Sequence, residues 1–196
     1  TEKTLKVPYE ITEPKAGAEY FLNVSFKLKE DESWADAGHE IAMGQFKLPV
    51  EVPEVEAVKA EDIADLTVEE AEEAVTVTGK DFTINFNKVT GTIDSFNYKD
   101  TELIENGPIP NFWRAATDSD LGYYSMLTLG TWRYAGLERQ IQDVTVEELG
   151  SNAVQFTVTS KLPTKTESDY KQVYTVYGTG DVKITSTLAP GADLPM

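Results

Sequence analysis

The sequence predicts an all-β fold, and two observations lead to that prediction. Much of the chain divides into short runs in which apolar and polar side chains alternate, as on a strand with one buried face. Clusters of glycine, proline and asparagine separate these runs, and no long stretch has the apolar spacing of an amphipathic helix. Short strands joined by turns are typical of antiparallel sheets.

Two alternating runs form the core of a first module, residues 1–50. Residues 20–28 place Leu22, Val24 and Phe26 on one face, and residues 39–48 return beside them. The polar loop between the runs contains Trp34 and ends at His39, for which we expect a structural role. Residues 4–8 predict one more strand. Three strands are too few for a β-sandwich of about seven, so this module is predicted to be partial.

Residues 51–74 are rich in acids and contain little to bury, so they predict a solvated acidic linker. The more specific alternative for so many carboxylates is a calcium-binding site. The stretch lacks the Asp-x-Asp-x-Asp-Gly loop that would support such a site.

The alternating pattern resumes in a second module, residues 75–196. Glycine-containing turns separate its strands, and residues 123–136 read as a short helix or a loop leading to Trp132. The predicted strands are 75–79, 81–86 (with Phe82, Ile84 and Phe86 inward), 92–98, 103–104, 140–148, 153–159, 170–177 and 181–188. The chain ends on a Pro/Gly turn, and both ends read as cuts, so we expect a truncated sandwich within a fragment of a longer protein.

Charge and composition exclude several classes of partner. The 34 acids against 17 basic residues give a net charge of -17, which disfavours nucleic acid and anionic membrane surfaces. The absence of cysteine excludes disulfides and zinc–thiolate sites. No apolar run reaches the roughly 18 residues of a membrane span. We therefore expect a protein that contacts neither nucleic acid nor membrane. A cytoplasmic location is expected, and the absence of cysteine fits an envelope or secreted protein equally well.

The segment Asn111-Phe-Trp-Arg-Ala-Ala-Thr-Asp-Ser-Asp-Leu-Gly122 concentrates the residues of greatest chemical interest. Asp118 and Asp120, two positions apart, would share one side of a strand and would suit a hard cation or acid–base work. The interpretation we favour is a rigid structural turn in which both carboxylates cap turn amides and pair with Arg114. If that pair is buried, losing one partner would cost about 3–5 kcal/mol.

The aromatic residues around this segment suit either of two roles. Trp113 and Trp132 are candidates for carbohydrate binding, because sugar sites often use aromatic platforms. The same side chains would serve equally well in a core or between domains, and both interpretations stay open.

Two stretches resemble bacterial β-galactosidases of glycoside hydrolase family 2. Residues 33–42 with 45–48 are similar to the Trp-Ala-x-x-Gly-His pattern near the end of that family's fourth domain. Residues 82–122 resemble its C-terminal domain, although Ser119 stands where asparagine is usual and Ala116 where proline is frequent. The resemblance implies a partial immunoglobulin-like β-sandwich followed by an antiparallel galactose-mutarotase-like β-sandwich, here truncated.

The resemblance also implies what this chain lacks. The family's catalytic carboxylates lie in a (β/α)8 barrel, and no alternation of strands and helices is present here, so no catalytic and no metal-ligating residue is assigned. The chain itself is expected to need no cofactor, whereas the parent would bind Mg²⁺ or Na⁺ near its barrel. The expected partners are the remainder of the parent chain, a β-galactoside and further subunits of a homo-oligomer. The alternative is a free-standing carbohydrate-binding or surface-adhesion β-module.

Overall fold

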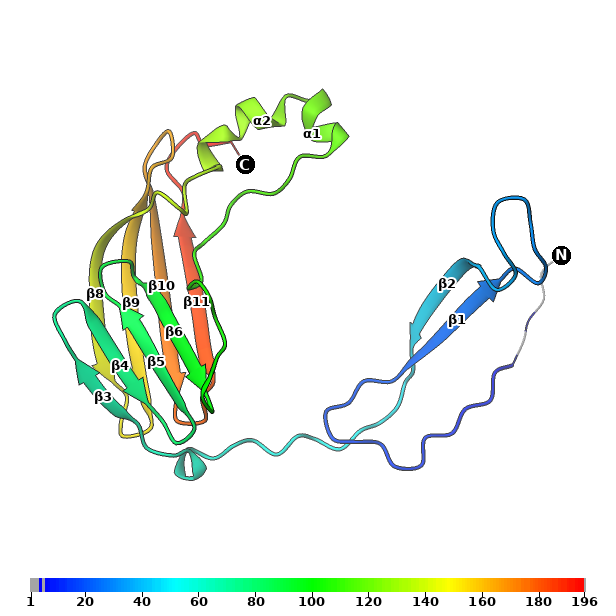
Figure 1. Cartoon of the computed structure of the whole chain (residues 1–196), viewed down its shortest axis with the longest axis horizontal. Coiled ribbons are helices and arrows are strands. Elements are labelled where there is room, and N and C mark those ends of the chain that lie inside the picture. The colour runs from blue at the N-terminus through cyan, green and yellow to red at the C-terminus, as the bar shows by residue number, and fades with distance from the viewer. Residues whose placement is uncertain (1–3, 5, 196) are drawn as a thin grey trace. The chain divides into compact units, whose positions relative to one another are not determined.

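The computed structural model describes residues 4 and 6–195. The chain forms two compact units, and the boundary between them along the sequence falls between Ala57 and Val58. Unit 1 is the part up to Ala57 and unit 2 the part from Val58 onward. The regular structure of unit 1 is a pair of strands and that of unit 2 is mostly strands, as Figure 1 shows, so the all-β prediction is confirmed.

Unit 1 contains one two-stranded antiparallel sheet. Strand β1 (Phe21–Lys27) pairs with β2 (Glu40–Lys47), and the register places Leu22 opposite Phe46 and Phe26 opposite Ala42. One face of the ribbon is therefore apolar, as the alternation predicts. Phe26 and Phe46 are nevertheless 66% and 59% exposed, because two strands alone cannot cover that face.

The loop between β1 and β2 is irregular, and so are the described residues before β1, 4 and 6–20. His39 meets the ring of Trp34 edge to face at 5.5 Å between centroids, a packing contact that agrees with a structural role. The strand predicted for residues 4–8 is not formed at 4 or 6–8, and Leu5 lies outside the described residues. Pro8 within this stretch and Pro14 after it have no backbone N–H to donate to a neighbouring strand.

Unit 2 is a sandwich of two antiparallel sheets. One sheet has the strand order β3-β4-β5-β6-β7 and the other β11-β10-β9-β8. The strands are β3 (Thr67–Glu70), β4 (Ala74–Thr78), β5 (Phe82–Asn87), β6 (Thr92–Tyr98), β7 (Thr101–Glu102), β8 (Gln140–Glu148), β9 (Ala153–Leu162), β10 (Ser168–Tyr177) and β11 (Val182–Ala189).

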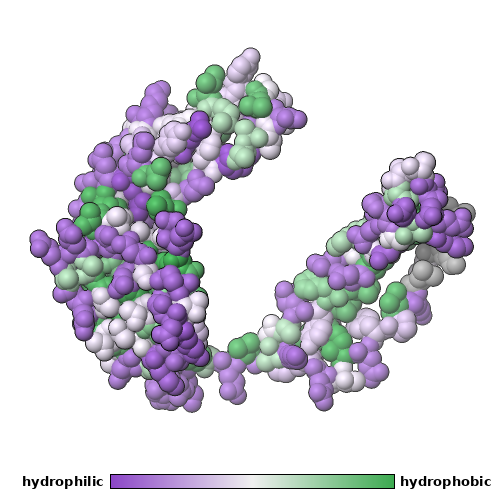
Figure 2. Space-filling view, viewed as in Figure 1, coloured by the Kyte–Doolittle hydropathy of each residue, from purple (hydrophilic) through white to green (hydrophobic). Residues whose placement is uncertain are grey.

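The core of the sandwich lies between β4–β6 and β9–β10. Phe82, Ile84 and Phe86 point inward as predicted, with 5%, 0% and 0% exposure. Phe86 stacks on Phe156 of the opposite sheet with ring centroids 4.2 Å apart, and it meets Tyr174 edge to face at 5.2 Å. These rings join the two sheets directly. Figure 2 shows mostly hydrophilic residues on the visible outer surface of this unit.

The structure corrects two boundaries. Residues 51–74 are not wholly a linker, because they contain a 3-10 turn (η1, Ala60–Asp62) and the edge strand β3. Val68 of β3 packs against the core while Glu69 and Glu70 stay exposed, so an acidic sequence is compatible with an edge strand. The short element expected at 103–104 forms two residues earlier as β7, and Ile104 packs against the core after it.

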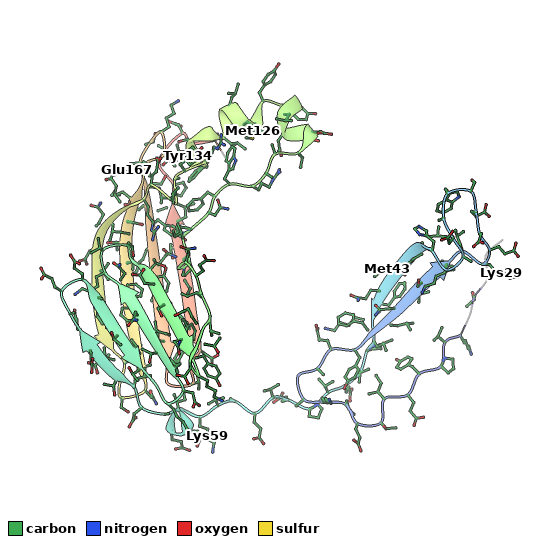
Figure 3. All side chains as sticks on the ribbon, viewed as in Figure 1. Lys29, Met43, Lys59, Met126, Tyr134 and Glu167 are labelled. Carbon is green, nitrogen blue, oxygen red and sulfur yellow. The ribbon has the colours of Figure 1, made fainter. Side chains whose placement is uncertain are left out.

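Between β7 and β8 the chain forms short helices instead of strands. They are α1 (Asp118–Gly122), α2 (Ser125–Thr128) and a 3-10 turn, η2 (Gly130–Trp132). Of the two alternatives for residues 123–136, a short helix or a loop, the structure shows the short helix α2 and the turn η2 that leads to Trp132. We refer to residues 111–136 as the connecting segment; Met126 on α2 and Tyr134 after η2 are labelled in Figure 3.

Candidate functional site

The connecting segment is held by a bidentate ion pair. Arg114 Nη1 donates to Asp120 Oδ2 at 2.6 Å, and Nη2 donates to Oδ1 at 3.0 Å. Arg114 Nη1 also donates to the carbonyl oxygen of Ala115 at 3.0 Å. The side chain of Arg114 is 67% exposed and that of Asp120 19%, so the condition of a buried pair is not met. The large energy expected for a buried pair therefore does not apply.

Asp120 also completes the cap of α1. Its Oδ2 accepts hydrogen bonds from the Thr117 backbone N–H at 2.7 Å and from the Thr117 hydroxyl at 2.9 Å. The Asp120 N–H in turn points to Thr117 Oγ1 at 3.4 Å, which makes a reciprocal capping box at the start of the helix. Thr117 was missed from the sequence, although a threonine three residues before an acid is the pattern of such a box.

These contacts fix the ionisation of Asp120. The hydrogen bond from the Thr117 N–H is the largest cause, followed by that from Arg114, and together they lower the carboxyl pKa from 3.8 to about 2. Asp120 is therefore a carboxylate at neutral pH, with both oxygens engaged. Such a group cannot deliver a proton as a general acid.

Asp118 does not join this arrangement. It is the exposed first residue of α1, and no hydrogen bond or ion pair of its side chain occurs within the described residues. The predicted turn containing Arg114, Asp118 and Asp120 is therefore wrong for Asp118. The two aspartates were expected on one side of a strand, but in a helix positions two apart point to nearly opposite sides. They cannot form a cation pair in this conformation.

Trp132 is part of a second, smaller core. It is 6% exposed, and its indole Nε1–H donates to the Pro195 carbonyl at 2.7 Å. The ring of Phe112 lies 5.8 Å from that of Trp132 and 5.6 Å from that of Tyr170, measured between centroids. Of the two roles left open for Trp132, the structure thus shows the packing role.

Trp113 is half-buried and lies beside a cavity of about 350 Å³. The lining is mainly apolar, and its charged groups are the paired Arg114 and Asp120. The full set is Phe112, Trp113, Arg114, Ala116, Asp120, Ser125, Met126, Leu129, Trp132, Leu188 and Pro195. A half-buried indole beside a small, mostly apolar cavity is suited to one face of a sugar ring or to an apolar side chain.

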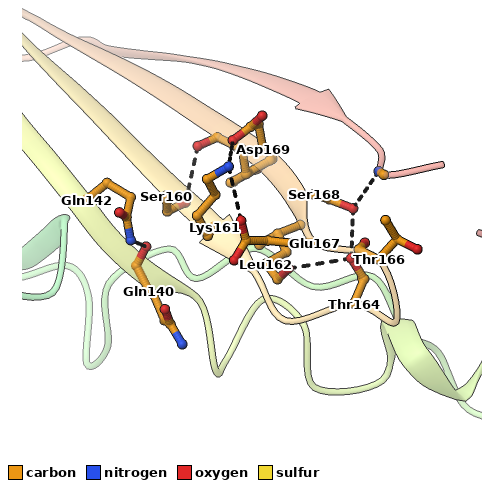
Figure 4. A network of polar contacts seen from close by, with 12 residues as sticks. Gln140, Gln142, Ser160, Lys161, Leu162, Thr164, Thr166, Glu167, Ser168 and Asp169 are labelled. Atoms are coloured by element: carbon orange, nitrogen blue, oxygen red, sulfur yellow. Dashed lines mark hydrogen bonds and ion pairs between the residues drawn. The ribbon is translucent and has the colours of Figure 1, made fainter.

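The turn between β9 and β10 forms hydrogen bonds to the connecting segment and to the residues after β11. The hydroxyls of Thr164 and Ser168 lie 2.8 Å apart, and Ser168 Oγ accepts from the Gly191 N–H at 3.0 Å, as Figure 4 shows. Lys165 N–H donates to Thr131 Oγ1 at 2.6 Å. These contacts tie the turn to the connecting segment and to the residues after β11, which bring Pro195 to the cavity.

The cavity does not offer the groups that glycoside hydrolysis needs. A retaining enzyme uses two carboxyl groups about 5 Å apart, one of them protonated. The cavity contains one carboxylate, Asp120, and both of its oxygens already accept hydrogen bonds. Its chemistry is therefore that of a packing or binding surface.

Acidic residues elsewhere do not gather into a metal site. Across residues 4 and 6–195, no group of three or more His, Asp and Glu side chains could hold a metal ion. The calcium alternative for 51–74 thus has no ligand cluster in the structure. In the same residues, no helix has the length and apolar character needed to cross a membrane.

Two family models match the chain. The model described as β-galactosidase small chain matches residues 78–196, which form most of unit 2. The model described as β-galactosidase domain 4 matches residues 1–49, within unit 1.

Curated relatives agree with these matches. The chain is 42% identical over 180 residues to a β-galactosidase of Priestia megaterium, and the match covers 90% of this chain and 17% of that protein. It is 35% identical to a β-galactosidase of Halalkalibacterium halodurans, with 86% and 16% covered, and 30% identical to one of Streptococcus thermophilus, with 92% and 17% covered. The chain thus spans about one sixth of the length of these relatives.

Proposed function

This chain belongs to the β-galactosidase family, and we propose from that premise that it is the non-catalytic β-sandwich part of an enzyme that hydrolyses terminal β-galactosyl residues. The family models match nearly the whole chain, whereas the relatives are about five times as long. The catalytic groups of the whole enzyme would then lie outside these residues. The proposed mechanism is that of a retaining glycosidase with two carboxyl groups.

One observation carries the non-catalytic assignment. Asp120, the carboxylate of the cavity, accepts four hydrogen bonds from Arg114 and Thr117 and has a pKa of about 2. A general acid needs a raised pKa, and a nucleophile needs an accessible oxygen. The environment of Asp120 supplies neither, so its role in this proposal is to hold α1.

The remaining assignments follow from the same proposal. Mg²⁺ or Na⁺ of the parent enzyme would be bound by residues outside this chain. The chain's partners would be the catalytic part of the parent and, through it, the other subunits of a homo-oligomer. A cytoplasmic location is part of this proposal, and the absence of cysteine is compatible with it as well as with the bacterial envelope.

The proposal is tested with the full-length parent. We expect the parent to release nitrophenol from o-nitrophenyl β-D-galactoside and not from the α-anomer. The Asp120→Asn substitution should mainly lower the melting temperature of the parent. The kcat/KM of the variant, measured well below that temperature, should change comparatively little. An inactive parent would refute the assigned reaction. A folded variant without measurable turnover would refute the structural role of Asp120.

A carbohydrate-binding module is the second candidate, and the half-buried Trp113 beside the cavity favours it. Galactose would then bind the isolated chain with a Kd in the millimolar range or below, as measured by calorimetry. Trp113→Ala should abolish that binding, whereas Trp34→Ala, at a ring 63% exposed in unit 1, serves as the matched control. Binding that survives Trp113→Ala, or no binding at all, would rule out this candidate.

A further inference from the structure

Asn106 and Gly107 form the one asparagine–glycine pair in the sequence. They lie after β7, in the stretch that leads into the connecting segment, where Asn106 is exposed and Gly107 is half-buried. Within the part of the chain that the structure describes, neither the Asn106 side-chain amide nor the Gly107 backbone N–H takes part in a hydrogen bond. Both groups are therefore free to react with each other.

The chemistry open to such a pair is intramolecular. Asn106 Cγ is the carbon of an amide, and the backbone nitrogen of the next residue can close a five-membered ring with it. Ring closure is obstructed by the side chain of most following residues, whereas glycine has no Cβ. Asparagine is counted among the thermolabile residues of proteins.

Asn111, a little further along the same stretch, lacks both favourable conditions. It is also exposed, but the residue after it is Phe112, whose ring obstructs closure. Its side-chain oxygen Oδ1 accepts a hydrogen bond from the Trp113 backbone N–H at 3.0 Å, which holds the amide in place. Asn111 is therefore an internal comparison for Asn106.

We propose that Asn106 is a site of spontaneous deamidation. The Gly107 nitrogen gives its proton to a base and attacks Asn106 Cγ, so that a bond forms between them. The bond from Cγ to Nδ2 then breaks, and the nitrogen leaves with that proton as ammonia. Water opens the resulting succinimide: addition at Cγ gives aspartate, and addition at the main-chain carbonyl gives isoaspartate, in which the main chain runs through the former side chain.

The isoaspartate product inserts a methylene into the main chain at a tightly packed point. A Cβ on Gly107 would overlap the Ile93 carbonyl oxygen and would lie 2.7 Å from Thr92 Oγ1, so the Gly107 backbone lies directly against β6. Thr92 Oγ1 also donates to the Pro108 carbonyl at 3.2 Å. A longer main chain before Gly107 displaces these contacts, and the start of the connecting segment is then held less firmly.

Peptide mapping of the whole chain after incubation at neutral and at alkaline pH tests the proposal. The tryptic peptide Asp100–Arg114 contains both Asn106 and Asn111, so fragment masses locate the change. We expect a mass gain of about 1 Da at position 106, where an amide becomes an acid, and none at Asn111. Isoaspartyl methyltransferase should label the same peptide. The reaction should be faster at alkaline pH, because the Gly107 nitrogen must lose its proton. A synthetic peptide of this sequence is the positive control.

Two variants separate the reaction from its structural consequence. Asn106→Gln keeps the amide but requires a larger ring, so it should stay unmodified and, after the same incubation, melt at a higher temperature than the unsubstituted chain. Asn106→Asp adds the charge without the methylene, and the freshly prepared variant should melt with the fresh chain. If Asn106 stays intact while the synthetic peptide deamidates, or if Asn111 reacts equally fast, the proposed site is overturned. Equal melting of the incubated chain and Asn106→Gln would overturn the structural consequence.

Discussion

The sandwich core and the connecting segment belong to one folded unit but are held by different interactions. In the core, Phe86, Phe156 and Tyr174 are fully buried and stack across the two sheets. In the connecting segment, Leu121, Tyr123 and Leu127 are 60%, 83% and 79% exposed, and short helices depend on a capping box and one ion pair. Apolar burial thus stabilises the first region, and local polar contacts with a small satellite core fix the second. The two regions should respond differently to substitution.

Phe86→Ala should produce the largest loss, because it removes a ring at the centre of the core. We expect the free energy of unfolding of unit 2 to fall by about 3–5 kcal/mol, as measured by urea denaturation. Val89→Ala, at a side chain 60% exposed in the following turn, is the control and should change little. A loss below about 1 kcal/mol for Phe86→Ala would contradict the stacked core.

Trp132→Phe should have an intermediate effect. It removes the hydrogen bond to the Pro195 carbonyl and part of the packing against Phe112, so we expect a loss of about 1–3 kcal/mol. Faster amide exchange should appear around residues 130–136 and leave β4–β6 unaffected. Trp34→Phe makes the same change at an exposed ring. Equal effects of the two variants would show that Trp132 is not a core residue.

Asp120→Asn should have a smaller and local effect. The substitution weakens both the capping box and the pairing with Arg114, so amides 117–124 should exchange faster while the core strands remain protected. Asp118→Asn is the matched control two residues away and should exchange like the unsubstituted chain. If both variants act alike, the structural distinction between the two aspartates is wrong.

The pH dependence of the connecting segment should be the smallest effect. The pKa of Asp120 is lowered in the folded chain, so its contribution to stability is complete above the unfolded pKa of 3.8 and is lost as the pH falls from there to about 2. Amide protection in α1 should decline over that range, and Asp120→Asn should remove this decline. A carboxyl of Asp120 that titrates near pH 4 by NMR would contradict the contacts.

The same comparison shows how far the sequence could be read. Alternation predicted the strands of the core and the inward direction of Phe82, Ile84 and Phe86, because burial on one face imposes a period of two. It missed β3, since an edge strand needs only Val68 on its buried side and tolerates acids elsewhere.

The connecting segment was less predictable, because its contacts depend on which side of the helix each side chain points to. The pairing of Arg114 with Asp120 was expected, but the inclusion of Asp118 was wrong once the residues formed a helix. The two tryptophans could not be distinguished by residue type. The hydrogen bond of the buried Trp132 indole depends on the carbonyl of Pro195, which lies far along the chain.

Hydrolysis of o-nitrophenyl β-D-galactoside by the isolated chain tests the central claim most directly. The claim is that these residues shape and support a β-galactosidase without supplying its catalytic groups. It predicts no release of nitrophenol above the uncatalysed rate, for the unsubstituted chain and for Asp120→Asn alike. Turnover by the isolated chain that Asp120→Asn abolishes would contradict it.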